Sequence, residues 1–322
     1  AQFAPALLLV LLTGAVADRI DRRRVVGVGA AVEAVLALAL AWYAGTDPRS
    51  IAPIVALVLL FGVAQAFSAP AVRSLPADMA GPDDVPRLTA RTAAAGQAGI
   101  VAGPVLGGFL YVADVRLPFV AFALLLVAGA AAMQFVRLAS AGRPTTPDWR
   151  AAAAQEAAVE PATGHAVATG GVQGAMEGLR FVRTQPVIFG AISLDLFAVL
   201  FGGAVALLPA IAKDRLGVGA VGLGWLQAAA GIGAGLTTLA LALRPLGHRL
   251  GRTLLGVVAL FGIWTVVLGV TRTYAVAFIA ILALSAADAV SVFIRATLVP
   301  LATPEDKRGR VLAVENVFIG AS

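Results

Sequence analysis

Apolar runs of roughly 20 residues follow one another along most of this chain, and they constrain its fold more than any other feature. An α-helix of that length crosses the ~30 Å hydrocarbon core of a bilayer. Within hydrocarbon only helices and closed barrels satisfy their backbone hydrogen bonds, and continuous apolar runs exclude the alternation of a barrel strand. Hydrophobic residues make up 60% and charged residues 13% of the chain, which excludes an ordinary soluble domain. The sequence therefore predicts an all-α membrane protein.

Positively charged loops orient the expected helices. We expect membrane spans at residues 2–14, 25–45, 52–77, 88–112, 116–137, 187–212, 220–243, 253–271, 274–299 and 311 onward. Most of the 24 Lys and Arg residues then fall in one set of alternate loops. The other set contains only Arg49, Arg116, Lys213, Arg215 and Arg272. Because short cytoplasmic loops are enriched in Lys and Arg, the arginine-rich set should face the cytoplasm.

The only long break between spans, residues 139–172, divides the chain in two. It is rich in Ala, Pro, Thr and Gly, which indicates a flexible cytoplasmic linker. A short amphipathic helix should follow on the inner membrane surface and end before Pro186. We therefore expect a first half at 1–138, a linker with this helix at 139–185, and a second half at 186–322. Both ends of the chain lie inside apolar runs, as expected for part of a longer protein.

Two loop patterns recur in the second half. Asp18-Arg19-Ile20-Asp21-Arg22 has an echo in His248-Arg249-Leu250-Gly251-Arg252. Arg73, followed by Pro82-Asp83-Asp84, has an echo in Arg295, followed by Pro304-Glu305-Asp306. Each pattern lies at a similar place in its half, so the sequence predicts two parallel, pseudo-symmetric halves.

A glycine, an acidic residue and several arginines lie between the first two spans. Their spacing resembles Gly-x3-Asp-Arg-x-Gly-Arg-Arg, the signature between helices 2 and 3 of the major facilitator superfamily. The matching residues are Gly14, Asp18, Arg19, Arg22 and Arg23. Asp21 replaces the usual glycine, and this form resembles the enterobactin-exporter and macrolide-efflux branch. The resemblance implies two six-helix halves, with about helices 2 to 11 present here, and a cytoplasmic latch at this loop. The alternative is an arginine cluster that only sets orientation.

A second motif, at residues 99–108, is rich in glycine. Gly99, Gly103 and Gly107 share one helix face, which predicts close backbone contact with a neighbouring helix. Pro104 removes one intrahelical hydrogen bond and should kink the helix. Together with Gly108, the pattern Gly-x3-Gly-Pro-x2-Gly-Gly resembles the antiporter signature of drug exporters in the superfamily, which implies export. An ordinary packing seam of small residues is the alternative.

Charged residues within the expected spans are candidates for transport chemistry, because burial in hydrocarbon is costly. Asp288 and Arg295 are separated by two helical turns and share one face, and Asp195 lies within the 187–212 span. The resemblance places both aspartates beside a central cavity, where they could carry a proton or meet a cationic substrate. The alternative is a structural Asp–Arg pair. For Glu33 we expect interhelical hydrogen bonding.

These observations define the expected partners and leave several functions open. We expect a monomer in a bacterial inner membrane, with a small-molecule substrate, protons and the lipid bilayer as partners. The basic residues are scattered through short loops, which argues against nucleic acid. The absence of cysteine and the presence of only two histidines argue against a metal site, and no motif suggests a cofactor or an enzyme. The resemblance implies proton-driven export of a siderophore, macrolide or drug; a lipid or lysophospholipid flippase and a non-transporting receptor or scaffold are the alternatives.

Overall fold

The protein is helical throughout the part of the chain that the computed structural model describes. That part comprises residues 22–46, 50–79, 84–135, 180, 182–186, 189–190, 193–194, 206–244 and 250–303. These residues form helices and short connections and include no strand. Seven of the helices are long and apolar enough to cross a membrane. The prediction of an all-α, multi-pass membrane protein is confirmed.

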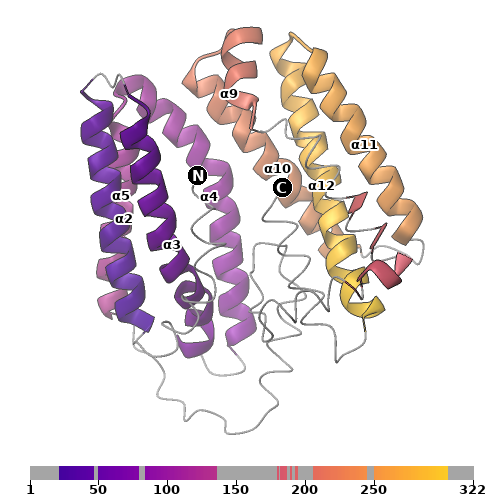
Figure 1. Cartoon of the computed structure of the whole chain (residues 1–322), viewed down its shortest axis with the longest axis horizontal. Coiled ribbons are helices and arrows are strands. Elements are labelled where there is room, and N and C mark those ends of the chain that lie inside the picture. Colours follow the sequence, from indigo (N-terminus) through magenta and orange to yellow (C-terminus); the bar gives the residue numbers. More distant parts are fainter. Residues whose placement is uncertain are drawn as a thin grey trace, which may run out of the picture. The chain divides into compact units, whose positions relative to one another are not determined.

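The chain forms two compact units, coloured from indigo to magenta and from orange to yellow in Figure 1. The first unit contains Ala1–Ala98 and Leu106–Arg143. The second contains Gly99–Val105 together with Pro144–Ser322. One helix, α4 (Val85–Ala113), therefore contributes its central residues to the second unit and the remainder to the first.

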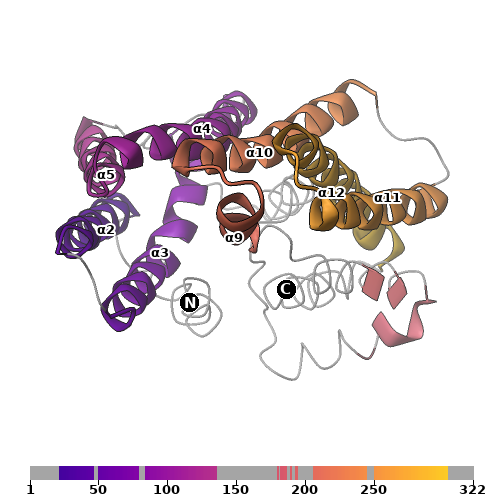
Figure 2. The same cartoon turned by 90° about the horizontal axis from the view of Figure 1, so that it is seen from above.

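In the first unit, α2 (Arg22–Ala44) packs against both α3 (Ala52–Met79) and α5 (Leu117–Phe135), and it lies between them in Figure 2. Small buried side chains allow this packing: Ala34 and Ala37 of α2 meet Ala123 of α5. The rings of Phe61 on α3 and Phe122 on α5 add a contact, with centroids 5.8 Å apart. Helix α2 is therefore the centre of this unit.

In the second unit, α12 (Tyr274–Ala302) packs against both α10 (Ala220–Leu243) and α11 (Leu250–Val270). Two short elements precede α10: α9 (Leu208–Ala210) and the π-helix η1 (Ile211–Arg215). The core of the unit is built from Leu208, Leu226, Leu268 and Ile281, all essentially buried. Helix α12 has the same central position here that α2 has in the first unit.

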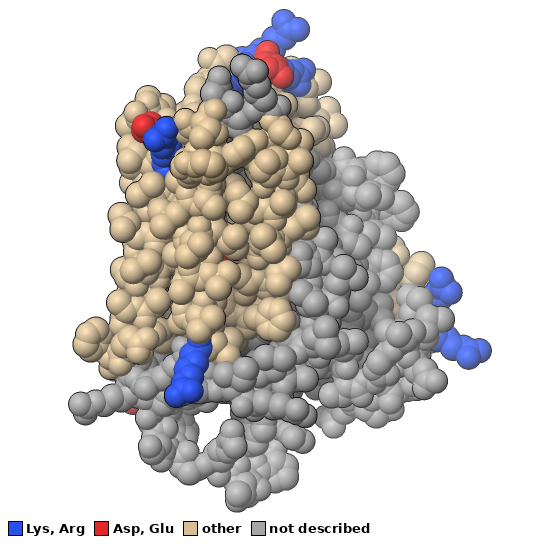
Figure 3. Space-filling view, turned by 60° about the vertical axis from the view of Figure 1, so that its left-hand side comes forward, with Lys and Arg blue, Asp and Glu red and all other residues tan. Residues whose placement is uncertain are grey.

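The outer surfaces of these helices are apolar. Val35, Trp42 and Leu125 expose 66%, 72% and 72% of their surface, respectively. In Figure 3 a broad tan area with almost no charged side chain separates the blue and red side chains at the top of the described surface from those near its lower end. Such a large exposed apolar band suits contact with lipid chains rather than with water.

The helix bounds agree with the expected spans wherever the structure describes them. The seven helices α2, α3, α4, α5, α10, α11 and α12 match seven expected spans with differences of at most three residues at either end. The expected spans at 2–14 and from 311 onward lie outside the described residues, and the 187–212 span is described only in part. Its helix continues past the expected end, because η1 extends to Arg215.

Candidate functional site

A polar face runs along α12, the central helix of the second unit. The helix is unbroken from Tyr274 to Ala302, so Asp288, Ser291 and Arg295 lie on one side of it. Asp288 lies halfway along the helix, about 21 Å from either end at 1.5 Å per residue, and it is half-buried. Ser291 and Arg295 are 5% and 4% exposed. The charged residues predicted for this span therefore face the interior of the unit rather than lipid.

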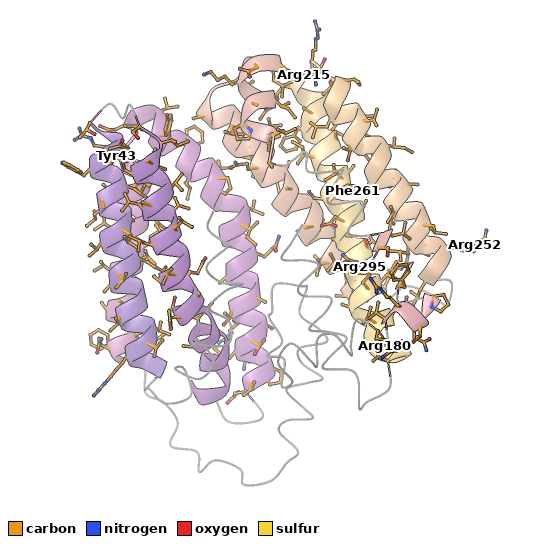
Figure 4. All side chains as sticks on the ribbon, in the orientation of Figure 1. Tyr43, Arg180, Arg215, Arg252, Phe261 and Arg295 are labelled. Atoms are coloured by element: carbon orange, nitrogen blue, oxygen red, sulfur yellow. The ribbon has the colours of Figure 1, made fainter. Side chains whose placement is uncertain are left out.

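The side of α12 next to this face packs against apolar residues of α11. Ile294, next to Arg295, is fully buried with Leu254 of α11. Figure 4 shows Arg295 on α12 within the second unit. The Arg295 side chain ends in a guanidinium group, whose five N–H donors lie in one plane. Helix α12 thus combines a mid-helix carboxyl group with a guanidinium group two turns away.

Glycines of α10 bring it into close contact with residues 99–105 of α4, which belong to the same unit. A Cβ atom added at Gly224 would overlap the carbonyl oxygen of Pro104 and lie 3.1 Å from its carbonyl carbon. A Cβ atom at Gly231 would lie 3.0 Å from side-chain carbons of both Ile100 and Val101. At Gly224 the two backbones approach at a distance that only glycine permits, whereas Gly231 meets side chains.

The contact differs from the one that the glycine motif predicted. Among the described residues, and apart from each glycine's chain neighbours and the adjacent backbone of α4, no heavy atom lies within 4 Å of a Cβ atom built at Gly99, Gly103 or Gly107. Gly99 and Gly103 are exposed, whereas Gly108 is buried. The expected seam along Gly99, Gly103 and Gly107 is therefore not seen in this part of the chain. The close approach depends on α10 glycines that the sequence analysis did not single out, although Gly224 and Gly231 recur at helical spacing.

A buried hydrogen bond joins α2 and α3 in the first unit. Ser68 Oγ lies 2.9 Å from Glu33 Oε1, and both residues are buried. This confirms the interhelical hydrogen bonding expected for Glu33. Hydrogen bonds of this kind help to hold helices together in hydrocarbon, where neither group has water as an alternative partner.

Two arginines from the arginine-poor loops hold the ends of helices. The Arg116 guanidinium donates a hydrogen bond to the carbonyl oxygen of Gly45, just after α2, over 2.9 Å. The Arg215 guanidinium donates likewise to the carbonyl oxygen of Gly269, in the last turn of α11. From the sequence, these arginines were expected only to help set the orientation of the helices. A loop arginine with a glycine at a neighbouring helix end is the signal that could have found them.

Several predicted site residues lie outside the described part of the chain: Gly14, Asp18, Arg19, Asp195, His248 and Arg249. Arg22 and Arg23 form the first turn of α2, but their side chains are outside the description. Arg252 is exposed near the start of α11 (Figure 4). Within the described residues, no cluster of three His, Asp or Glu side chains could hold a metal ion.

The expected amphipathic helix is described only at its carboxyl end. Val182 is 2% exposed, whereas Arg180 and Arg183 are exposed. This inward valine with outward arginines is the pattern that an amphipathic helix at a membrane surface requires. The boundaries of the linker remain a prediction.

Comparison with known proteins identifies the fold. The family model described as Major Facilitator Superfamily matches residues 1–322. A D-xylose-proton symporter is 15% identical, with a TM-score of 0.62, and the match covers 99% of this chain and 75% of that one. A bacterial homolog of the human lysosomal transporter Spinster, in an inward-facing and unoccupied conformation, is 16% identical with a TM-score of 0.64, covering 98% and 70%. The human organic anion transporter MFSD10 (TETRAN) is 20% identical with a TM-score of 0.54, covering 99% and 73%. No curated protein sequence matches the chain.

Proposed function

The chain belongs to the major facilitator superfamily, and we propose that it is a secondary active transporter that exports a small amphiphilic molecule in exchange for protons. The observation that carries this proposal is the polar face of α12, where half-buried Asp288 lies at the middle of a membrane-spanning helix. Ionisable residues at that depth are costly and commonly serve ion or substrate pathways. We also propose that the protein lies in a bacterial inner membrane.

Proton exchange could drive export by alternating access, in which two halves open a midplane site first to one side and then to the other. Asp288 and Asp195 would carry the proton, and Arg295, on the same face of α12 as Asp288, would belong to the same coupling site. A proton moving through ~200 mV releases about 4.6 kcal/mol, given ~2.3 kcal/mol per 100 mV. At ~1.4 kcal/mol per tenfold change, one proton sustains a substrate gradient of the order of 10³.

In addition to the polar face of α12, two sequence motifs support the proposal. The loop with Gly14, Asp18, Arg19, Arg22 and Arg23 would act as the cytoplasmic latch, with His248, Arg249 and Arg252 as its weaker echo in the second half. Residues 99–108 would act in export, as their resemblance to the antiporter signature implies. The contact of Pro104 with Gly224 supports a role for residues 99–105 in packing against α10 within the second unit.

The solved relatives define an alternative direction of transport. One of them is a proton symporter for D-xylose, and symport would move substrate and proton the same way. The likeness in fold does not distinguish symport from exchange, so the experiment must measure direction. A flippase would instead respond to lipid headgroups and be indifferent to uncouplers.

Flux in proteoliposomes with an imposed pH gradient tests the proposal. The purified protein should move a siderophore, a macrolide or a cationic dye against the proton flow. We expect Asp288→Asn to reduce this flux at least tenfold, because Asn cannot carry a proton, while Asp214→Asn, an exposed change in η1, leaves it unchanged. Substrate movement in the same direction as protons would favour symport. Equal flux from the Asp288 and Asp195 variants and the unmodified protein would exclude both aspartates from coupling.

A further inference from the structure

The first unit contains a buried carboxyl group that the proposed transport cycle does not use. Glu33 lies halfway along α2, about 16 Å from either end of the helix at 1.5 Å per residue. Only 8% of its surface is exposed. The buried neighbours along α2, such as Ala34 and Ala37, supply no polar side chain. A carboxylate ion at this depth would have almost no solvation.

The hydroxyl group of Ser68, the partner of Glu33, has one hydrogen atom but lies close to two oxygen atoms that could accept it. Ser68 Oγ lies 2.9 Å from Glu33 Oε1 and 3.0 Å from the carbonyl oxygen of Ala64. A serine hydroxyl has a single hydrogen, whereas carboxylate and carbonyl oxygens only accept. If Glu33 were ionised, the two contacts would therefore have to share one hydrogen.

Protonation of Glu33 supplies the missing hydrogen. The acid O–H of Glu33 would donate to Ser68 Oγ, and the Ser68 hydroxyl would donate to the Ala64 carbonyl oxygen one turn earlier in α3. Each short contact is then a complete hydrogen bond. The geometry is thus fully satisfied by the neutral acid and only partly by the anion.

Gly29 brings α3 close enough for this arrangement. It lies one turn before Glu33 on the same face of α2. A Cβ atom at this position would lie 2.8 Å from Ser68 Cβ and 3.2 Å from Ser68 Oγ. A larger residue would therefore push Ser68 away from Glu33. Three positions on two helices form the site together.

The packed helices supply no close positive charge among their described side chains. On α2, Arg24 is exposed and lies about 13 Å from Glu33 along the axis, and Tyr43 lies near the opposite end. On α3 the charged residues are Arg73 and Asp78, whose side chains are outside the description. Helix α5 has no ionisable residue. The described side chains of these helices therefore place no positive charge beside Glu33 that would stabilise the anion.

We propose that Glu33 and Ser68 form a proton-binding site between α2 and α3, with Glu33 in its neutral acid form at neutral pH. The ligand is the proton itself, which completes the chain of hydrogen bonds from Glu33 to Ala64. This site is separate from the coupling aspartates of the second unit. Release of the proton would require water or a cation to reach Glu33, of which only 8% is exposed.

Infrared difference spectroscopy tests the site without measuring transport. The spectrum of the Glu33→Gln variant is subtracted from that of the unmodified protein at about pH 8, where an exposed Glu with a pKa near 4.3 is ionised. We expect the difference to contain the C=O stretching band of a protonated acid. Carboxylate bands in its place would overturn the proposal, and they are what an ionised, purely structural Glu33 would produce.

A second variant tests the hydrogen-bond chain. Ser68→Ala removes the acceptor of the acid proton, so the acid band should shift to higher frequency. Ser291→Ala, another buried serine but in the second unit, is the matched control and should leave the band unchanged. Equal spectra for Ser68→Ala and the unmodified protein would contradict the assignment to this pair. Because no flux is measured, failure of the transport proposal would leave these outcomes unaffected.

A third measurement uses the unmodified protein alone. Dicyclohexylcarbodiimide is apolar and reacts with protonated carboxyl groups in hydrocarbon surroundings. At about pH 8 we expect Glu33 to be modified at least tenfold faster than the exposed Asp114 and Asp214, as followed by peptide mass spectrometry. Faster modification of the exposed carboxyls than of Glu33 would count against the proposal.

Discussion

Single glycines and arginines decide the tightest contacts within each unit. The carbonyl groups at the end of an α-helix have no partner within the helix, and a cation near them is favourable. Arg116 supplies that partner after α2, and Arg215 does so in the last turn of α11. A Cβ atom on Gly45 would overlap the Arg116 guanidinium. A larger residue at position 45 would require the Arg116 side chain to shift from the place where it caps α2.

Gly29 and Gly27 provide a matched test of close approach at the residue scale. Gly29→Ala should destabilise the protein by about 1–3 kcal/mol, the range for overpacking, because its Cβ would lie 2.8 Å from Ser68 Cβ. Gly27→Ala should be neutral or stabilising, since nothing described lies within 4 Å and Ala favours helix. Thermal unfolding in detergent measures both. Equal midpoints for the two variants would contradict the contact.

At the scale of elements, α10 is built with two close-packing faces. Gly224 and Gly231 meet residues 99–105, whereas Gly233 meets Leu282 of α12, whose carbonyl carbon lies 3.0 Å from an added Cβ atom. Other residues of α10 are also small and fully buried, among them Ala228 and Ala229. Small residues let backbones approach, and van der Waals contact then supplies the packing that hydrophobic exclusion cannot supply in lipid.

Alanine substitutions in α10 test these two faces separately. Gly224→Ala and Gly233→Ala should each lower the unfolding midpoint by several degrees, because each added methyl group would overlap a carbonyl oxygen of the facing helix. Gly256→Ala on α11 is the control, with no described atom within 4 Å. A destabilised Gly256 variant, or tolerance of both α10 variants, would show that close packing is not the cause.

At the scale of the whole molecule, each unit gathers its arginine-poor loops at one end. In the first unit the bond from Arg116 to Gly45 joins the loop after α4 to the end of α2. In the second unit the bond from Arg215 to Gly269 joins η1 to the end of α11. Both pairings agree with the sorting of charges by alternate loops. The cytoplasmic assignment of the opposite ends follows from the charge rule and stays a prediction.

Single cysteines can test this topology, because the sequence contains none. Thr46→Cys and Lys213→Cys, both exposed in arginine-poor connections, should react in intact cells with a maleimide that cannot cross membranes. Arg87→Cys and Arg252→Cys, also exposed, should react only after the cells are opened. Labelling of the second pair in intact cells would invert the orientation. A mixed result within either pair would contradict the topology itself.

The sequence by itself determined the class of protein, the positions of the described spans and the family resemblance. Runs of apolar residues have to become helices in hydrocarbon, so length and composition suffice to locate α2 or α12. The sequence also places Asp288 and Arg295 on one face of a helix, because they are seven residues apart and the periodicity of an α-helix is fixed. The sequence predicted that Glu33 forms a hydrogen bond with another helix, but it did not identify the partner residue.

Only the tertiary structure decided which helix faces meet. The motif at Gly99, Gly103 and Gly107 suggested a packing seam, yet the close approach in the second unit comes from Gly224 and Gly231 of α10. In the same way, Ser68 became the partner of Glu33 because Gly29 allows α3 to approach. Any face of small residues can pack closely, so its partner depends on how the helices are rotated and crossed, which local sequence does not encode.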